Sequence, residues 1–399
     1  MPPPSFIRHP DARAFAQAGV TVAQKSEPRG LIPAHPVQTS VAMLMGALEG
    51  GFPFCVSDNP VPDLPALPHA HFATLTGGTS GPPKVILRSQ HSWIRSFHTN
   101  ADLFRYSARD GIAVLGALGH SLALYGVLEG LHLGLTVHTL SDLSPYGQCG
   151  RMAEAECTIL YATPAQLRLL PLHMPLTGIR LILCGGGALT CATRAHIAAL
   201  CPNAALHVFY GAAETSFITL GGPNTPEGSV GRAYPEVELM VRTPDATGTG
   251  TIWIRSPYLF ERYLSGSSPH TCRDGDWLTV GELGHLDEQG NLFLQGRAGR
   301  VFTVADQTIY PEALEEQFCA LDGIRQCAVL ARPDPLRGRH MVVIIEGPEN
   351  LHTGEALLTH CRANALTVPR AVLFLDQFPL LPSGKPDLCQ IATATGCIL

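Results

Sequence analysis

Residues 75–86 have the sequence LTGGTSGPPKVI, which holds three glycines, two prolines, three hydroxyl residues and one lysine in twelve positions. HFATLT at its start predicts a strand, and VILRS after Lys84 predicts a second one. Glycines let backbone N–H groups crowd around an anion, and hydroxyls with a lysine suit a polyphosphate. The segment lacks the G-x-x-x-x-G-K-[ST] spacing of a Walker loop. It predicts a phosphate loop, although its composition alone fits a flexible hairpin equally well.

The composition is that of a globular chain. Its 399 residues are 45% hydrophobic and 15% charged, which is enough for two or three domains. A net charge of −6 gives no footprint for nucleic acid, so small molecules or proteins are the expected partners. The sequence shows no signal peptide or membrane-spanning run, and its twelve cysteines are scattered without C-x-x-C. These features predict a cytoplasmic protein with reduced thiols and no membrane partner.

From about residue 40, short apolar runs alternate with helix-like segments. Strands are predicted for FPFCVS, GIAVLGAL, LTVHTL, CTILYATP, IRLILCGGG and ALHVFYG. Helices are predicted for SVAMLMGALEGG, SQHSWIRSFHTNADLF, HSLALYGVLEGLHLG, TPAQLRLL and TCATRAHIAALC. The alternation predicts an α/β fold with a mostly parallel sheet flanked by helices, and binding residues at the carboxyl ends of its strands.

The pattern changes twice further along the chain. After residue 220, turn-rich sequence with alternating apolar residues predicts a small antiparallel β region. From about Arg300, a last unit has α+β patterning, in PEALEEQFCAL, QCAVLARP, HMVVIIEG, GEALLTHCRANA and AVLFLDQFPLL. No internal repeat or low-complexity linker is visible.

Three further stretches carry charged residues that suit nucleotide chemistry. FYGAAETSF presents Glu214 after a strand, and a carboxylate opposite a phosphate loop is a natural Mg²⁺ ligand. The stretch 275–302 contains Glu282, which can accept from ribose hydroxyls, and Arg297, which can neutralise phosphate. FPLLPSGKPDL places Lys385 on a Pro-Ser-Gly turn. Each of these residues alone is equally typical of solvated surface.

Together and in this order, the stretches resemble the motifs of the adenylate-forming superfamily. This superfamily includes acyl-CoA synthetases, aryl-acid–AMP ligases, adenylation domains of peptide synthetases, and luciferases. Residues 76–84 follow its phosphate loop, [YF]-T-S-G-[ST]-T-G-x-P-K-G, and residues 210–214 follow Y-G-x-T-E. The remaining matches are Gly228, Gly231 and Pro235 to G-x-x-G-x-x-x-P, residues 281–284 to G-D-L-G, Gly296 and Arg297 to G-R-x-x-D, and residues 382–387 to P-S-G-K-x-D.

The resemblance implies an N-terminally shortened member with two domains. An adenylation core over residues 1–298 has mostly parallel sheets flanked by helices and includes the small β region at about 221–298. A mobile α+β lid domain over residues 299–399 carries the catalytic lysine. Because fewer residues precede Thr76 than in ordinary members, the front of the first subdomain is missing. A homodimer or another partner is therefore expected to cover exposed apolar surface.

The resemblance also implies a two-step reaction. A carboxylate attacks the α-phosphate of ATP to give acyl-AMP and pyrophosphate, and a phosphopantetheine thiol, of CoA or an acyl or aryl carrier protein, then takes the acyl group. Lys385 would bridge the carboxylate and the α-phosphate, Lys84 would hold the outer phosphates, and Glu214 would hold Mg²⁺. The implied ATP-binding residues are Thr76, Gly78, Thr79, Ser80, Gly81, Lys84, Gly186, Gly187, Ala188, Tyr210, Gly211, Glu282 and Arg297.

The implied acyl pocket is lined by His120, Tyr125, Cys184, Gly185, Phe209, Ala212 and Phe217. No aspartate lies between Leu118 and Leu128, where peptide-synthetase domains hold the substrate ammonium, so an α-amino acid is not expected. An aryl acid and a fatty acid both fit, and the shortened chain favours a compact acid.

The hinge between the domains departs from the family pattern. Gly299 and Arg300 stand at the usual acidic pair, Thr303 replaces a common lysine, and Asp306 replaces a glycine of the pantetheine tunnel. No basic residues can be assigned to the 3′-phosphate of CoA. A carrier-protein thiol is therefore slightly favoured over CoA.

Two other classes of function stay open. The divergent hinge, and Ala213 in place of a threonine, favour a non-catalytic or partner-dependent relative that binds ATP or acyl-AMP without turnover. The presence of Lys84, Glu214 and Lys385 together favours an active ligase. An amide ligase that hands the adenylate to an amine would use the same residues.

Overall fold

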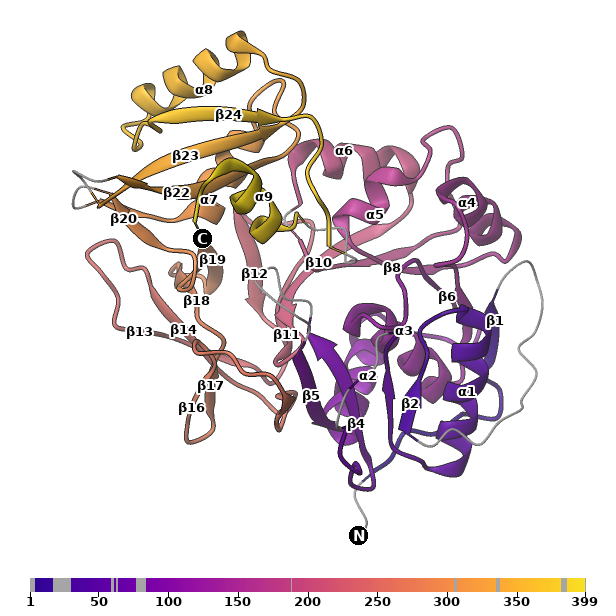
Figure 1. The fold of residues 1–399 in the computed structure, drawn as a ribbon. Coiled ribbons are helices and arrows are strands. Elements are labelled where there is room, and N and C mark those ends of the chain that lie inside the picture. Colours follow the sequence, from indigo (N-terminus) through magenta and orange to yellow (C-terminus); the bar gives the residue numbers. More distant parts are fainter. Residues whose placement is uncertain are drawn as a thin grey trace.

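The structure is a computed structural model, which describes residues 4–16, 30–58, 61, 64–76, 84–187, 189–304, 307–334, 338–381 and 386–398 (Figure 1). The predicted site residues Gly78, Thr79, Ser80, Gly81, Ala188 and Lys385 lie outside these described residues, as does Asp306 of the hinge. Within the described ranges, no helix is both long enough and apolar enough to span a bilayer.

The larger sheet starts with parallel strands that are covered on both faces. Their order is β1 (Arg13–Ala16), β7 (Thr136–Thr139), β6 (Gly111–Val114), β8 (Ile159–Ala162), β9 (Leu181–Cys184) and β10 (Ala205–Ala212). One face packs on α3 (Ser121–Leu133). The other packs on α4 (Pro145–Glu154), α5 (Pro164–Leu169) and α6 (Cys191–Leu200). The central strands β6, β8 and β9 are buried throughout and read as continuous apolar runs because neither face meets water.

The same sheet continues as antiparallel strands. β11 (Ser216–Gly221) returns along β10 and is followed by β12 (Ser229–Ala233), β19 (Asn291–Arg297), β18 (Glu282–Leu286), β14 (Gly250–Arg255), β17 (Trp277–Thr279) and β16 (Cys272–Asp274), with β13 (Glu238–Arg242) paired to β14. The antiparallel region after residue 220 is thus hydrogen-bonded to the parallel strands.

The second sheet carries the two strands that flank the predicted phosphate loop. Its order is β15 (Arg262–Ser265), β5 (Lys84–Ser89), β4 (His71–Thr76), β3 (Phe54–Val56) and β2 (Gly30–Ile32). Helix α1 (Val37–Gly50) contacts β2 and β3, and α2 (Gln90–Leu103) contacts β5 and α3. One apolar core therefore joins both sheets, through residues such as Phe72, Trp93 and Leu128.

The C-terminal unit has a sheet and core of its own, above the antiparallel strands in Figure 1. Its elements are β20 (Phe302–Val304), β21 (Gln307–Ile309), α7 (Pro311–Cys319), β22 (Cys327–Asp334), β23 (Gly338–Glu346), α8 (Leu351–Ala363), β24 (Ala371–Leu375) and α9 (Leu388–Thr395). β22 pairs antiparallel with β23, and β23 pairs parallel with β24. Apolar clusters cover both faces of this sheet.

The predicted α/β fold with an α+β C-terminal unit is confirmed. Two helices, α4 and α9, were not predicted. The sequence of α4, PYGQCGRMAE, contains two glycines that weaken its helical pattern. Its start is nevertheless fixed, because Ser144 accepts a hydrogen bond from the backbone of Gly147 and a proline follows. The sequence of α9, LCQIATAT, is rich in threonine, and the side chain of Asp387 caps it.

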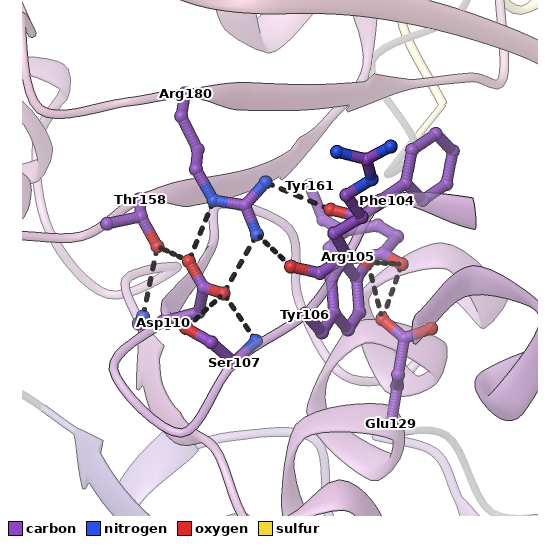
Figure 2. A network of polar contacts seen from close by, with 10 residues as sticks. Phe104, Arg105, Tyr106, Ser107, Asp110, Glu129, Thr158, Tyr161 and Arg180 are labelled. Atoms are coloured by element: carbon purple, nitrogen blue, oxygen red, sulfur yellow. Dashed lines mark hydrogen bonds and ion pairs between the residues drawn. The ribbon is translucent and has the colours of Figure 1, made fainter. Parts of the chain in front are cut away.

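Hydrogen-bonded networks of polar side chains link elements of the core (Figure 2). Asp110, just before β6, accepts from Arg180 at 2.8 and 2.9 Å and from Thr158 at 2.7 Å. Burial would raise the pKa of Asp110, but these hydrogen bonds outweigh it and lower the pKa to about 2. Arg180 also donates to the carbonyl of Phe104, so the end of α2 is joined to the main sheet.

Glu129 lies completely buried on α3, where the helix approaches the sheet closely. A Cβ at Gly130, the next residue, would come within 2.3 Å of Val137. The carboxylate of Glu129 accepts from Tyr161 at 2.6 Å and from Tyr106 at 3.3 Å (Figure 2). It also accepts from Asn100 at 2.8 Å. Burial raises the pKa of Glu129 to about 7, against the effect of these donors.

We expect the stability of the chain to report the titration of Glu129. Its pKa in the folded chain lies above the value in the unfolded chain, so its contribution is favourable at acid pH and is lost as the pH rises through about 7. From pH 5 to 8, the free energy of unfolding of wild type should fall by about 2 to 3 kcal/mol relative to Glu129→Gln. Urea unfolding at both pH values measures the difference, and the exposed Glu288→Gln serves as control. Parallel pH profiles for wild type and Glu129→Gln would contradict this assignment.

Candidate active site

The two ends of the predicted phosphate loop face each other. Thr76 ends β4 and is the register partner of Lys84, which begins β5. The loop itself, residues 77–83, lies outside the described residues. The ammonium of Lys84 stands 5.8 Å from the centre of the Tyr263 ring, over its face. The face of the ring attracts the ammonium and so holds the Lys84 side chain in place.

Glu214 lies on the turn between β10 and β11 and contacts the same tyrosine. The hydroxyl of Tyr263 donates to its carboxylate at 2.8 Å and also contacts the hydroxyl of Thr271 at 3.0 Å. Tyr263 is therefore the residue that brings Lys84 and Glu214 to one place. Glu214 is 9% exposed, so its carboxylate is held in a fixed position rather than solvated.

The turn that carries Glu214 is so tight that it limits which residues can stand in it. A Cβ at Gly211 would lie 2.0 Å from the carbonyl oxygen of Ser216, so only glycine fits there. Ser216 itself has φ +57°, a left-handed conformation that costs energy for a residue with a side chain. Such a turn persists only where its surroundings hold it.

Arg88 supplies that support, from β5. Its guanidinium donates to the carbonyl of Ala213 at 2.5 Å, to the hydroxyl of Ser216 at 2.8 Å and to the carbonyl of Tyr258. The indole of Trp93 donates to the same serine hydroxyl at 2.9 Å. Arg88 therefore joins three segments of the chain beneath Glu214.

Arg88 is fully buried, and within the described ranges no carboxylate lies at ion-pair distance from it. Burial lowers its pKa to about 9, while Glu214, its nearest acid, acts to raise it, so the guanidinium stays charged at neutral pH. Sequence reasoning missed this residue. The sequence nevertheless contains a sign of its role, because Arg88 stands inside the apolar strand KVILRS. A charged residue that is fully buried normally has a partner.

Three of the implied ATP-binding residues, Glu282, Arg297 and Tyr210, form a second group. Glu282 and Arg297 are register partners on β18 and β19, and the Arg297 Nε donates to the Glu282 carboxylate at 3.0 Å. Glu282 is 7% exposed, and burial raises its pKa while Arg297 opposes that shift. Burial and the neighbouring Glu282 also raise the pKa of Tyr210 well above its usual value. Glu282, Arg297 and Tyr210 are thus brought together.

The segment 266–271 runs between the two groups and was not predicted as part of the site. A Cβ on Gly266 would come within 2.8 Å of the Lys84 side chain. Cβ atoms on Gly281 and Gly299 would come within 2.4 and 2.8 Å of His270. This segment therefore touches Lys84 at one end and the hinge at the other.

The aromatic residues of the predicted acyl pocket lie together. The ring of Phe217 is 5.2 Å from that of Tyr125 and 4.6 Å from that of Phe209. Phe209 also packs on Gly185, where a Cβ would lie 2.3 Å from its ring. A side chain at position 185 would displace this ring.

The other predicted pocket residues are placed differently. Cys184 is fully buried in the apolar cluster on the opposite face of the sheet, so it does not join the aromatic residues. Alternate residues of a strand point to opposite faces, which is the reason for this correction. His120 immediately precedes α3 and bridges to Leu75, and Ala212 ends β10. Gly186 has φ +85°, and Gly187 follows it after β9.

The predicted hinge residue Arg300 is bound to the C-terminal unit. Its guanidinium makes a two-point contact with the Glu315 carboxylate of α7, at 3.0 and 2.7 Å, and lies 3.3 Å from Glu312. Glu315 also accepts from the backbone of Val329 at 2.8 Å. Arg297 is held by β18, whereas Arg300 is held by the C-terminal unit. Only Ala298 and Gly299 separate the two arginines.

Comparison with known proteins gives consistent results. The family described as "AMP-binding enzyme" matches residues 14–264, and "AMP-binding enzyme C-terminal domain" matches residues 313–385. An uncharacterised acyl–CoA ligase, YhfT of Bacillus subtilis (strain 168), is 29% identical over 360 residues, covering 87% of this chain and 73% of that protein.

Two solved structures show the same fold at low identity. The amide bond synthetase McbA from Marinactinospora thermotolerans has a TM-score of 0.73 and 21% identity, covering 92% of this chain and 90% of that one. The O-succinylbenzoate coenzyme A synthetase from Bacillus subtilis, in complex with ATP and magnesium ion, has a TM-score of 0.70 and 21% identity, covering 80% and 69%.

We expect Arg88→Lys to destabilise the chain, because an ammonium cannot reach all the acceptors that the guanidinium satisfies. Leaving one or two buried carbonyls unpaired should lower the free energy of unfolding by about 2 to 4 kcal/mol. Urea unfolding measures this loss. The control is Arg95→Lys, on neighbouring α2, whose half-exposed side chain pairs with Glu236 and should matter by less than about 1 kcal/mol. Equal losses for the two variants would contradict the role given to Arg88.

Proposed function

This chain belongs to the AMP-binding enzyme family, and on that premise we propose that it activates a carboxylic acid as acyl-AMP and transfers the acyl group to a phosphopantetheine thiol. The observation that carries the proposal is that Lys84, which follows the glycine-rich loop at the start of β5, and Glu214 both contact Tyr263 of the neighbouring strand β15. These groups have the charges that ATP with a divalent cation requires.

In the first step, an oxygen of the substrate carboxylate attacks the α-phosphorus of ATP. The bond from this phosphorus to the bridging oxygen breaks, and pyrophosphate leaves with the electron pair. The protein's task is to position the reactants and to neutralise charge. Lys84 and the loop would bind the outer phosphates, and Lys385 would bridge the carboxylate and the α-phosphate.

The residues present fit a magnesium ion shared between the protein and the phosphates. Glu214 offers a buried carboxylate with one oxygen engaged by Tyr263. In the described part of the chain, no three His, Cys, Asp or Glu side chains gather into a metal cage. Mg²⁺ commonly takes one or two carboxylates together with substrate phosphates. When bound, it would supply positive charge to the phosphate oxygens.

The lysine content supports the two lysine roles. The chain contains three lysines, Lys25, Lys84 and Lys385, and two of them stand in the motifs. Lysines that merely face solvent are usually numerous on a protein surface. Two of only three lysines at motif positions therefore favour a role in the site.

For the substrate, we propose a compact apolar acid, aryl rather than long-chain. Tyr125, Phe209 and Phe217 would provide aromatic walls, and the Phe209 ring already occupies the space beside Gly185. CoA or a carrier-protein thiol would accept the acyl group. YhfT is named as an acyl–CoA ligase, which supports CoA, whereas the absence of an assigned 3′-phosphate site supports a carrier protein.

The proposal is tested by pyrophosphate release from ATP across a panel of aryl, short-chain, long-chain and amino acids. Strong release with small aryl acids is expected. The mass of the product formed with CoA, a carrier protein or an amine then identifies the acceptor, and an amide product would establish an amide ligase instead. Silence across the panel, in a protein that binds ATP, would favour a non-catalytic or partner-dependent relative.

Glu214→Gln should raise the Mg²⁺ concentration needed for half-maximal pyrophosphate release. The increase should be about tenfold to a hundredfold, at least the cost of losing an outer-shell partner of a metal. A Mg²⁺ titration of the acid-dependent release measures it. Glu261→Gln is the matched control, because this nearby carboxylate contacts His71 instead. An unchanged titration would remove Glu214 from the metal site.

Lys385→Ala should abolish formation of acyl-AMP while leaving thiol transfer from added acyl-AMP largely intact. This separation is expected because the lysine would act where the carboxylate meets the α-phosphate, which the second step no longer involves. Single-turnover assays of each half-reaction measure it, with Lys25→Ala as control. Survival of adenylation, or loss of both steps in a folded variant, would contradict the role of Lys385.

A further inference from the structure

Two cysteines of the C-terminal unit lie in direct contact. Cys319 is the last residue of α7 and Cys327 is the first residue of β22, and their sulfur atoms are 3.8 Å apart. Helix α7 packs against β22, so the contact is part of the domain's packing. Among the residues that the structure describes, no second pair of sulfur atoms touches.

The two thiols differ in access. Cys319 is partly exposed, whereas Cys327 is 6% exposed and contacts the carbonyl of Glu315 at 3.6 Å. A hydrogen bond from Cys327 lowers the pKa of Cys319. Three other buried cysteines show the opposite shift, because burial raises the pKa of Cys55, Cys157 and Cys184 to about 12. Reaction with an oxidant requires an accessible thiolate.

We propose that Cys319 and Cys327 are a redox modification site, which forms a reversible disulfide when the protein meets hydrogen peroxide. The thiolate of Cys319 attacks one peroxide oxygen, the O–O bond breaks, and hydroxide leaves and takes up a proton to become water. The sulfenic acid on Cys319 is then attacked by the sulfur of Cys327, which loses its proton as a second water departs. Two thiols are oxidised and one peroxide is reduced.

The two sulfur atoms must approach each other for this bond to form. A disulfide requires sulfur atoms about 2 Å apart, whereas those of Cys319 and Cys327 are 3.8 Å apart. Cys319 stands at the end of α7, with Ala320 as the C-cap. The bond would tie the end of α7 to β22.

The cysteine pair lies next to the residue that binds Arg300. Glu315, whose carbonyl touches Cys327, holds Arg300 of the hinge through its carboxylate. The disulfide would thus fix the helix that carries the hinge's partner. The inference does not depend on the proposed reaction, because it concerns the thiols of the folded chain alone.

The test is a peptide map of the full chain after treatment with hydrogen peroxide, digested without reductant. Wild type should yield a disulfide-linked peptide containing Cys319 and Cys327, lose two free thiols, and recover both with dithiothreitol. Cys319→Ser should give no such link. Cys272→Ser, which removes an exposed cysteine of β16, should retain it.

Cys327→Ser separates the two chemical steps. With the second thiol absent, the sulfenic acid on Cys319 should persist and be trapped by dimedone. Thermal unfolding of each variant checks that the C-terminal unit stays folded. Wild type that oxidises Cys319 directly to sulfinic acid without a link, or a Cys319→Ser variant that still links Cys327 to another cysteine, would overturn the proposal.

Discussion

The buried guanidinium of Arg88 connects β5, the strand after the predicted phosphate loop, to the turn that carries Glu214. It reaches Ala213 and Ser216 on that turn, and Tyr258 on the segment leading to β15. A buried charge without a carboxylate partner costs desolvation energy, which hydrogen bonds to several acceptors must offset. These hydrogen bonds hold β5 and the turn after β10 in one arrangement, although Arg88 and Ala213 are 125 residues apart in the sequence.

This constraint makes the site a product of both sheets. Lys84 and Tyr263 belong to the smaller sheet, while the turn bearing Glu214 joins two strands of the larger one. The pair Glu282–Arg297 lies further along the larger sheet, next to the change of domain. Segment 266–271 runs from Lys84 to Gly299. This segment therefore links the surroundings of Lys84 to the start of the C-terminal unit.

The fold was largely predictable from the sequence because its strands are short apolar runs separated by helices of ordinary length. The hairpin around the loop followed from HFATLT and VILRS, and the structure pairs Thr76 with Lys84. Helix α4 escaped prediction because its glycines weaken the pattern, while its start depends on the Ser144 cap. Local sequence did not reveal that the antiparallel strands extend the parallel sheet, because this depends on the pairing of β11 with β10 and with β12, which forms only in the folded chain.

The candidate site was predicted through its motifs, and its supporting contacts were not. Motifs identify Lys84 and Glu214, but the role of Tyr263 between them depends on strand pairing that only the folded chain has. The resemblance to the family assigned Cys184 to the acyl pocket, whereas strand alternation turns it to the other face of the sheet. The hinge looked degenerate in sequence because Arg300 replaces an acid, yet the structure pairs it with Glu315.

In the proposed reaction, this arrangement promotes attack of a carboxylate on the α-phosphate of ATP. The most direct test is exchange of labelled pyrophosphate into ATP, because only reversible formation of an adenylate with release of pyrophosphate produces it. Label should enter ATP when a suitable carboxylic acid is present and should stay out when the acid is omitted. Binding of ATP and acid without any exchange, or the appearance of ADP and phosphate, would contradict it.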